Sequence, residues 1–149
     1  MTADDARLAR AARSLARASR LLERACGDLN LSQYRVLAAV ASGHERASRI
    51  ADRLAVGKPA ISATVESLCR RGLLTRGPVA GDQRAVALAL TPGGERALAA
   101  AETAIVERID ALARHAPDGE ALLDALATLG TALDAMSAAR HGTAGEPAS

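Results

Sequence analysis

The side chains best suited to bind a charged partner lie between positions 58 and 84. Lys58 is followed one helical turn later by Ser62, and Arg70 lies two turns beyond Ser62. Arg84 comes after a segment rich in glycine, proline and aspartate, where the chain must turn. Lysine and arginine neutralise phosphates, and a serine hydroxyl can bond a phosphate or a base edge. This spacing predicts a surface that binds a polyanion.

Charge is unevenly distributed along the 149 residues, although the net charge is only +2. Residues 1–44 carry a net charge of +3, residues 45–84 carry +4 and residues 85–149 carry −5. A basic middle segment and an acidic C-terminal third indicate a polyanion-binding module joined to a region with another task.

The chain lacks the patterns that catalysis and metal binding require. His44, His115 and His141 are scattered, with no cysteine or carboxylate at zinc-ligand spacing. Gly93 and Gly94 begin a predicted helix, but the residues around them do not fit a nucleotide-binding loop, and no nucleophile motif is present. We therefore expect no enzyme activity, no metal and no cofactor.

Two cysteines, Cys26 and Cys69, are too few for a disulfide framework. Their simplest interpretation is as small, partly buried thiols, and the alternative is a redox-sensing role, because oxidation of Cys69 would disturb the helix that carries it. The N-terminus lacks a secretory signal and no run of about 18 apolar residues occurs. We expect a cytoplasmic protein without a membrane partner.

Composition and periodicity predict a mainly α-helical chain. Apolar residues make up 49% of the sequence, with one tyrosine and no tryptophan or phenylalanine. The residues of 73–76, the turn-forming residues of 77–82 and the alternating residues of 85–90 predict a β-hairpin. Residues 141–149 are predicted to be a flexible tail. Helices are predicted over residues 4–25, 32–41 (with Ser32 as the N-cap), 47–54, 59–71, 92–115 (with Thr91 as the N-cap) and 118–139.

The two predicted helices 47–54 and 59–71, joined by a tight turn, are typical of a helix-turn-helix. Ala51 is small enough for the helices to approach closely. Five apolar residues are expected to lock the pair together: Ile50, Leu54, Val56, Ile61 and Val65. The outward arc of the second helix, which can lie in the major groove of DNA, is then formed by Pro59, Ser62, Ala63, Glu66 and Arg70, with Lys58 at its tip.

Individual roles on this arc follow from side-chain chemistry. Lys58 and Arg70 are candidates for phosphate contacts, with Arg71 a weaker one, and Ala63 can touch a thymine methyl group. Glu66 either orients an arginine or accepts from a cytosine amine, and we favour the first role. The hairpin that follows is a wing, from which Arg84 can enter a narrow minor groove while Asp82 holds a basic side chain in position.

Leucines recur at helical spacing outside this module. Leu8, Leu15 and Leu22 are seven residues apart in the first helix, and the last helix has a similar stripe from Leu122 to Met136. An alanine-rich core buries little area per residue, which favours packing against a second copy. The arginines on the other side of the first helix are either solvated or paired with the acidic last helices of that copy.

The sequence resembles the MarR family of transcriptional regulators over residues 30–100. The matching segments are Leu31–Leu37, Ile50–Leu54, Gly57–Ser62, Leu68–Leu74, Asp82–Val86 and Leu88–Thr91, with Gly94. The resemblance implies a winged helix-turn-helix over residues 31–91 and a helical dimerisation region formed by residues 1–30 and 92–140. The fold class is therefore mainly α with a small β-hairpin wing.

The resemblance also implies a homodimer that binds a pseudo-palindromic operator in double-stranded DNA. Such a regulator is expected to act as a repressor that a small-molecule effector releases. The effector site is unknown, although Tyr34, the one aromatic residue, could line it. The alternatives are a redox-sensing regulator using Cys26 or Cys69, and a winged-helix protein-interaction module that does not bind DNA. The expected DNA-binding residues are Lys58, Pro59, Ala60, Ser62, Ala63, Arg70, Asp82 and Arg84.

One departure from the family lies in the recognition helix. Relatives often have a longer polar residue where this chain has Ala63. With no arginine, asparagine or glutamine on the first two turns, the helix can make few direct hydrogen bonds to bases. Specificity is expected to depend on Ser62, methyl contacts and the DNA shape that the wing reads.

Overall fold

The computed structural model describes residues 2–44, 46–79 and 81–143, with the side chains of 79, 82–85 and 141–143 left out of the description. Six helices and one two-stranded antiparallel sheet occur in these residues. Their order is α1 (Ala3–Ala25), α2 (Leu31–Ala41), α3 (Ala47–Leu54), α4 (Lys58–Arg70), β1 (Leu74–Val79), β2 (Asp82–Leu90), α5 (Pro92–His115) and α6 (Gly119–Thr143). The predicted fold class is confirmed.

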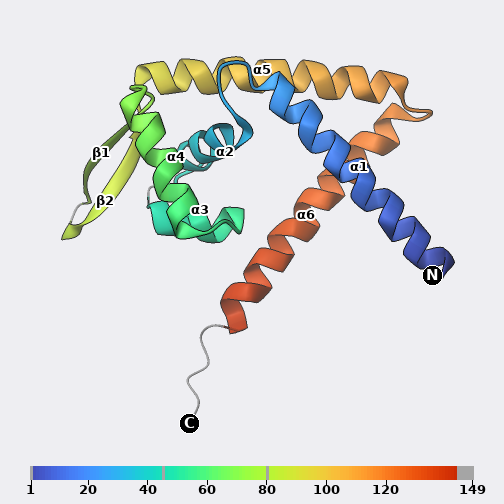
Figure 1. Ribbon diagram of the computed structural model, residues 1–149, viewed down its shortest axis with the longest axis horizontal. Helices are drawn as coiled ribbons and strands as arrows, with labels where there is room; N and C mark the ends of the chain where they lie inside the picture. Colours follow the sequence, from blue (N-terminus) through green and yellow to red (C-terminus); the bar gives the residue numbers. More distant parts are fainter. Residues whose placement is uncertain (1, 45, 80, 144–149) are drawn as a thin grey trace, which may run out of the picture.

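Helix α5 runs along one side of the molecule and joins its two parts (Figure 1). At one end lie α2, α3, α4 and the hairpin, which we call the winged lobe. At the other end α1 and α6 extend away from α5 (Figure 1). Helix α6 returns toward the lobe, where Asp134 lies 3.7 Å from Arg53 of α3.

The core of the winged lobe is formed by the inner faces of its helices. Val36 and Leu37 of α2, Ile50 of α3 and Leu68 of α4 are fully buried. Ile61 and Val65 continue the inner face of α4, so the predicted lock between α3 and α4 is largely confirmed. Val56 departs from it, because it lies in the turn and is 37% exposed.

The prediction that Ser32 caps α2 is wrong. The N-cap is Asn30, whose Oδ1 accepts from the Gln33 backbone N–H at 2.8 Å. Gln33 Oε1 in turn accepts from the Asn30 backbone N–H at 3.1 Å, which completes a capping box. Ser32 is exposed within the first turn. A box formed by asparagine and glutamine satisfies two backbone donors, which a Ser32 cap would leave unpaired.

The hairpin is longer than predicted. Leu74 pairs with Leu90 at its base, and Val79 pairs with Asp82 near the tip. Gly77 and Pro78, expected in the turn, belong to β1. Leu88 is buried in the lobe, whereas Val86, two residues nearer the tip, is half exposed. The hairpin projects beyond the helices of the lobe (Figure 1).

The passage from the hairpin into α5 is held by contacts around Gly94. Thr91 caps α5 as predicted, accepting from the Gly94 N–H at 3.0 Å. The Thr91 N–H donates to the Leu73 carbonyl at 3.1 Å. Gly94 packs so closely against that carbonyl that no Cβ could be accommodated there. This close approach sets the direction of α5 relative to α4 and the wing.

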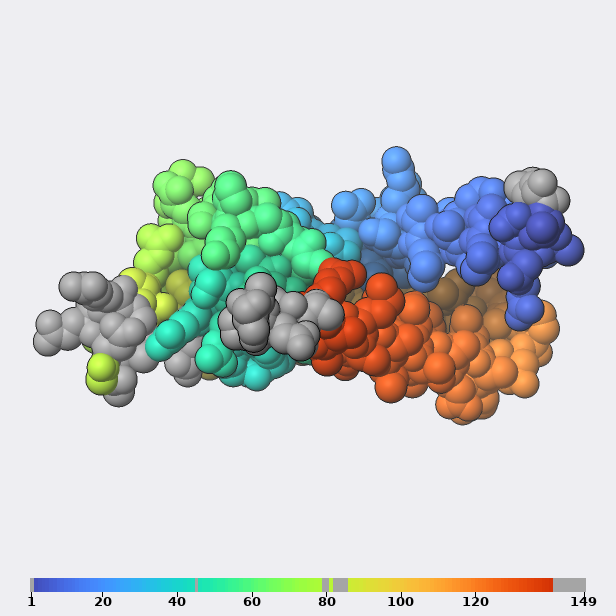
Figure 2. Space-filling model, turned by 90° about the horizontal axis from the view of Figure 1, so that it is seen from below, coloured from blue at the N-terminus to red at the C-terminus, as the bar shows by residue number. Residues whose placement is uncertain are grey.

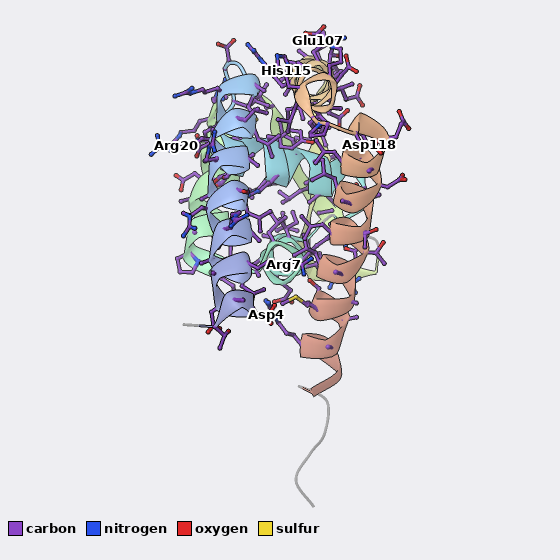
Figure 3. All side chains as sticks on the ribbon, turned by 90° about the vertical axis from the view of Figure 1, so that its right-hand side faces the viewer. Asp4, Arg7, Arg20, Glu107, His115 and Asp118 are labelled. Carbon is purple, nitrogen blue, oxygen red and sulfur yellow. The ribbon has the colours of Figure 1, made fainter. Side chains whose placement is uncertain are left out.

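The apolar stripes of α1 and α6 are largely uncovered. Leu8 is 63% exposed, and Leu133 and Met136 are each 54% exposed. Figure 2 shows α1 and α6 as two ridges with a furrow between them, and Figure 3 shows the same two helices standing apart. An exposed apolar area of this extent is typical of a surface that another molecule covers.

One helix in the described part of the chain is long and apolar enough to cross a membrane, judged by length and composition alone. It is residues 119–140 of α6, with a mean hydropathy of 1.2, and none of this window is buried. The segment also contains the carboxylates of Glu120, Asp124 and Asp134, which are costly inside a bilayer.

Replacing Gly94 by alanine tests the close approach at the start of α5. The added methyl group would overlap the Leu73 backbone, so we expect Gly94→Ala to lower the free energy of unfolding by about 1–3 kcal/mol. Urea denaturation followed by circular dichroism measures this change. Gly93→Ala is the matched control, since a Cβ added at Gly93 would lie 3.6 Å from its nearest neighbours, the Gly72 carbonyl oxygen and Thr91 Oγ1. Equal effects at both glycines would contradict the packing argument.

Candidate nucleic-acid interface

The outer face of α4 is exposed on the winged lobe. Pro59, Ser62, Ala63 and Glu66 are exposed, while Ile61, Val65 and Leu68 on the opposite face are buried. The predicted division of α4 into an inner and an outer arc is therefore confirmed. A helix held only by its inner face leaves the outer one free for a partner.

The beginning of α4 carries positive charge and has no capping side chain. Gly57 is the N-cap and supplies no side-chain hydrogen bond. Ala60 and Ile61 donate to the Gly57 carbonyl, at 3.1 and 3.2 Å. Pro59 has no N–H, and Lys58 is exposed at the tip. This end of the helix, with its partial positive charge and a lysine, suits an anion.

Glu66 and Arg70 are paired on the outer face of α4. Arg70 Nη1 lies 3.7 Å from Glu66 Oε1, one helical turn away. The structure thus supports the favoured role of Glu66, which is to orient an arginine. Both side chains are largely exposed, so the pair contributes little to stability. Its consequence is that part of the Arg70 charge is compensated within the protein.

A hydrogen-bond network missed by the sequence analysis joins α4 to α2. Gln33 is the buried polar residue at its centre. Its Nε2 donates to Ser67 Oγ at 3.2 Å, and its Oε1 accepts from Arg71 Nη1 at 2.9 Å. Arg71, expected as a weak phosphate candidate, is therefore engaged by the protein itself. Only the capping pattern Asn30–Gln33 could have signalled this network, and it predicts the cap without the contact to α4.

The wing residues Asp82 and Arg84 lie outside the described side chains. Their backbone belongs to β2, which pairs with β1 up to Val79–Asp82. Their roles at a minor groove stay predictions.

Two open cavities flank α5. One, of about 440 Å³, is lined by the end of α2, by β2 and by α5, and includes Glu95 and Glu102. The other, of about 400 Å³, lies between the α1–α2 connection and α5, and includes Cys26 and Arg71. Tyr34, expected to line an effector site, lines neither of these two cavities. It is half-buried, and burial, with smaller contributions from Glu102 and Cys26, raises the pKa of its hydroxyl.

The environment of Cys26 disfavours a reactive thiolate. The side chain is buried, and its Sγ donates to the Leu22 carbonyl at 3.1 Å. Burial, and to a lesser degree the charge of Glu23, raises the pKa of the thiol, while Arg35 opposes this shift. A thiol with a raised pKa stays protonated at neutral pH and is a poor nucleophile. Cys69 is partly buried.

Solved structures share this arrangement over most of the chain. A MarR-family transcriptional regulator from Rhodococcus sp. RHA1 superposes with a TM-score of 0.75 and is 20% identical, over 89% of this chain and 96% of that one. The transcriptional repressor CouR, solved with a 23-mer DNA duplex, is 28% identical, with a TM-score of 0.68 over 79% of this chain and 87% of that one. PcaV from Streptomyces coelicolor, solved with its natural ligand, is 27% identical, with a TM-score of 0.63 over 80% of this chain and 88% of that one. No curated protein matches the sequence.

The three-helix lobe, its exposed second helix and the hairpin define a winged helix-turn-helix protein. Residues 27–85 match the sequence profile of the MarR family. Together with the structural similarity, this match shows that the chain has the fold of MarR-family winged-helix regulators and is similar to that family in sequence over residues 27–85.

The protected state of Cys26 can be measured with a thiol reagent. In a Cys69→Ala variant at pH 8, we expect Cys26 to react with Ellman's reagent at least about tenfold more slowly in the native protein than in denaturant, because the thiol is buried and protonated. The reciprocal Cys26→Ala variant reports Cys69 under the same conditions. Equal native and denatured rates for Cys26 would instead favour the redox-sensing alternative.

Proposed function

We propose that this regulator is a homodimer that binds a specific pseudo-palindromic DNA site and represses transcription until a small-molecule effector releases it. The observation that carries the proposal is the outer face of α4, which is exposed, small in profile and flanked by basic side chains. Such a helix fits into a major groove of about 12 Å. The similarity to CouR, a repressor solved with a DNA duplex, supports the same function for this chain.

Residue roles in DNA binding follow from positions on α4 and the wing. Lys58 at the helix start binds a phosphate, Ser62 bonds a base edge or phosphate, and Ala63 contacts a thymine methyl. Pro59 and Ala60 allow the DNA to approach closely because their side chains are short.

Farther along α4, Arg70, oriented by Glu66, binds a second phosphate, and Arg84 of the wing enters the minor groove. Asp82 positions a basic side chain.

A second copy of the chain is proposed to cover the apolar stripes of α1 and α6. The furrow between these helices is open in the single chain (Figure 2). Leu8 and Leu15 on α1 and Leu133 and Met136 on α6 are each more than half exposed, and Leu126 of α6 is 38% exposed. Two lobes held by such a dimer can read two half-sites about one DNA turn apart.

An effector is proposed to act between the dimerisation helices and the winged lobe. The two cavities beside α5 lie where the lobe meets α5, so an occupant would contact both regions. PcaV, solved with its natural ligand, supports effector binding in this chain. If the lobe can adopt a DNA-binding and a non-binding orientation, a ligand that binds them unequally shifts their populations and hence the DNA affinity.

DNA binding is tested by selecting duplexes from a random pool and measuring their affinity by fluorescence anisotropy. We expect a site of roughly 20 base pairs with twofold symmetry. Arg84→Ala should weaken binding to A·T-flanked sites and lower the slope of log K against log salt by about one. Arg114→Ala, on the far part of α5, is the control. An unchanged slope for Arg84→Ala excludes the wing contact, and no duplex binding at about 50 mM salt would favour a protein-interaction module.

The dimer is tested by sedimentation equilibrium. The wild-type chain, of 15.2 kDa, should sediment at twice this mass. Leu133→Glu places a charge on the apolar stripe of α6 and should shift the protein toward monomer. The control is Ala127→Glu, which lies on another side of the same exposed helix. A monomeric wild type, or equal effects of both variants, would contradict this interface.

A further inference from the structure

We infer that the DNA footprint extends beyond α4 and the wing onto α2, where Arg35 binds a backbone phosphate and Ser32 borders the same contact. This inference rests on the proposed DNA binding. Neither residue was expected to contact DNA, because both belong to a helix whose sequence pattern describes the core of the lobe.

The placement of Arg35 comes from a small crevice between α2 and the start of α4. The crevice has a volume of about 40 Å³ and is lined on one side by Ser32 and Arg35. On the other side it is lined by Ala60, Ile61 and Thr64 of α4, with Leu54 at the end of α3 and Val56 in the turn. Ala60 is one of the proposed DNA-contacting residues. Arg35 therefore borders the face of α4 that is proposed to enter the groove.

If α4 lies in the major groove, its diameter places the DNA backbone beside Arg35. A helix with its side chains is about 10–12 Å across, and the major groove is about 12 Å wide. The sugar-phosphate walls of the groove must then lie directly beside the flanks of α4. Groups that stand next to a flank of the helix meet phosphates, whereas groups on its outer arc meet base edges.

Arg35 has the properties required for that contact. It is exposed, and it forms no ion pair with a carboxylate among the described residues. This contrasts with Arg70, whose charge is shared with Glu66, and with Arg71, which donates to Gln33. Ser32, about one turn before Arg35, is also exposed and lines the same crevice. An uncompensated guanidinium beside the reading helix supplies the charge that the sparse outer arc of α4 lacks.

The experiment measures the salt dependence of DNA affinity for Arg35→Ala, with the selected duplex and with a scrambled duplex of the same length. We expect the slope of log K against log salt to fall by about 0.9, as for one lost phosphate contact, and the affinity to fall by the same factor for both duplexes. Arg35→Lys retains the charge and should retain the slope. Arg20→Ala is the matched control, because Arg20 is also an exposed arginine but lies on the side of α1 away from α6, outside the winged lobe (Figure 3).

Each outcome decides the inference. If Arg35→Ala behaves like Arg20→Ala while the wild type binds DNA, the phosphate contact is excluded and the proposed function is retained. If Arg35→Ala weakens only the selected duplex, Arg35 reads a base and the phosphate assignment is overturned. If the wild type binds neither duplex at about 50 mM salt, the proposed function fails and this inference fails with it. Equal melting temperatures of the variants show that the fold is retained.

Discussion

The exposed outer face of α4 depends on how the inner face of the same helix packs into the core of the winged lobe. Leu68 is fully buried against a core that includes Val36, Leu37 and Ile50, and Ile61 and Val65 extend the same apolar seam. This burial leaves the opposite side of α4 projecting from the lobe. The Gln33 network adds direction to the apolar contact, because hydrogen bonds to Ser67 and Arg71 favour one orientation of α4 on α2. A buried amide with three satisfied bonds resists sliding of the helix, which a purely apolar seam tolerates.

A second constraint acts at the start of α5. The contact between Gly94 and the Leu73 backbone, together with the Thr91 cap, joins the end of the hairpin to α5, which leads to the proposed dimerisation helices. The direction of α5 therefore follows from the packing of the wing base. In the proposed dimer, a change at the cavity that Cys26 lines would be transmitted to α4 through this junction, because Leu73 and Arg71 also line that cavity. Few intervening side chains separate the proposed effector region from the proposed DNA surface.

The outer face of α4 has few side chains that can bind DNA bases, and most of the positive charge lies on the residues around it. Ser62 and Ala63 offer limited base readout, and the Arg70 charge is shared with Glu66. The proposed contacts from Arg35 on one flank and from the wing beyond the hairpin place positive charge around the inserted helix. Affinity would then come largely from the phosphates, and specificity from the spacing of two lobes and from DNA shape. This division explains how a helix with few long polar side chains can serve in a sequence-specific regulator.

Local patterns in the sequence by themselves determined the order of the elements, the inner and outer faces of α4, the Thr91 cap and the presence of the hairpin, because each depends on residues close together in the chain. They could not place Gln33 against Ser67 and Arg71, whose separations of 34 and 38 residues become hydrogen bonds only after folding. They assigned the α2 cap to Ser32 because serine is a common N-cap, whereas the reciprocal bonds of Asn30 and Gln33 satisfy two donors at once. The tertiary structure also decided that Val56 and Val86 stay exposed and that Arg35 lies beside Ala60. The residue types between positions 58 and 84 are enough to predict which groups could bind DNA. Only tertiary packing brings residues of α2 next to this region.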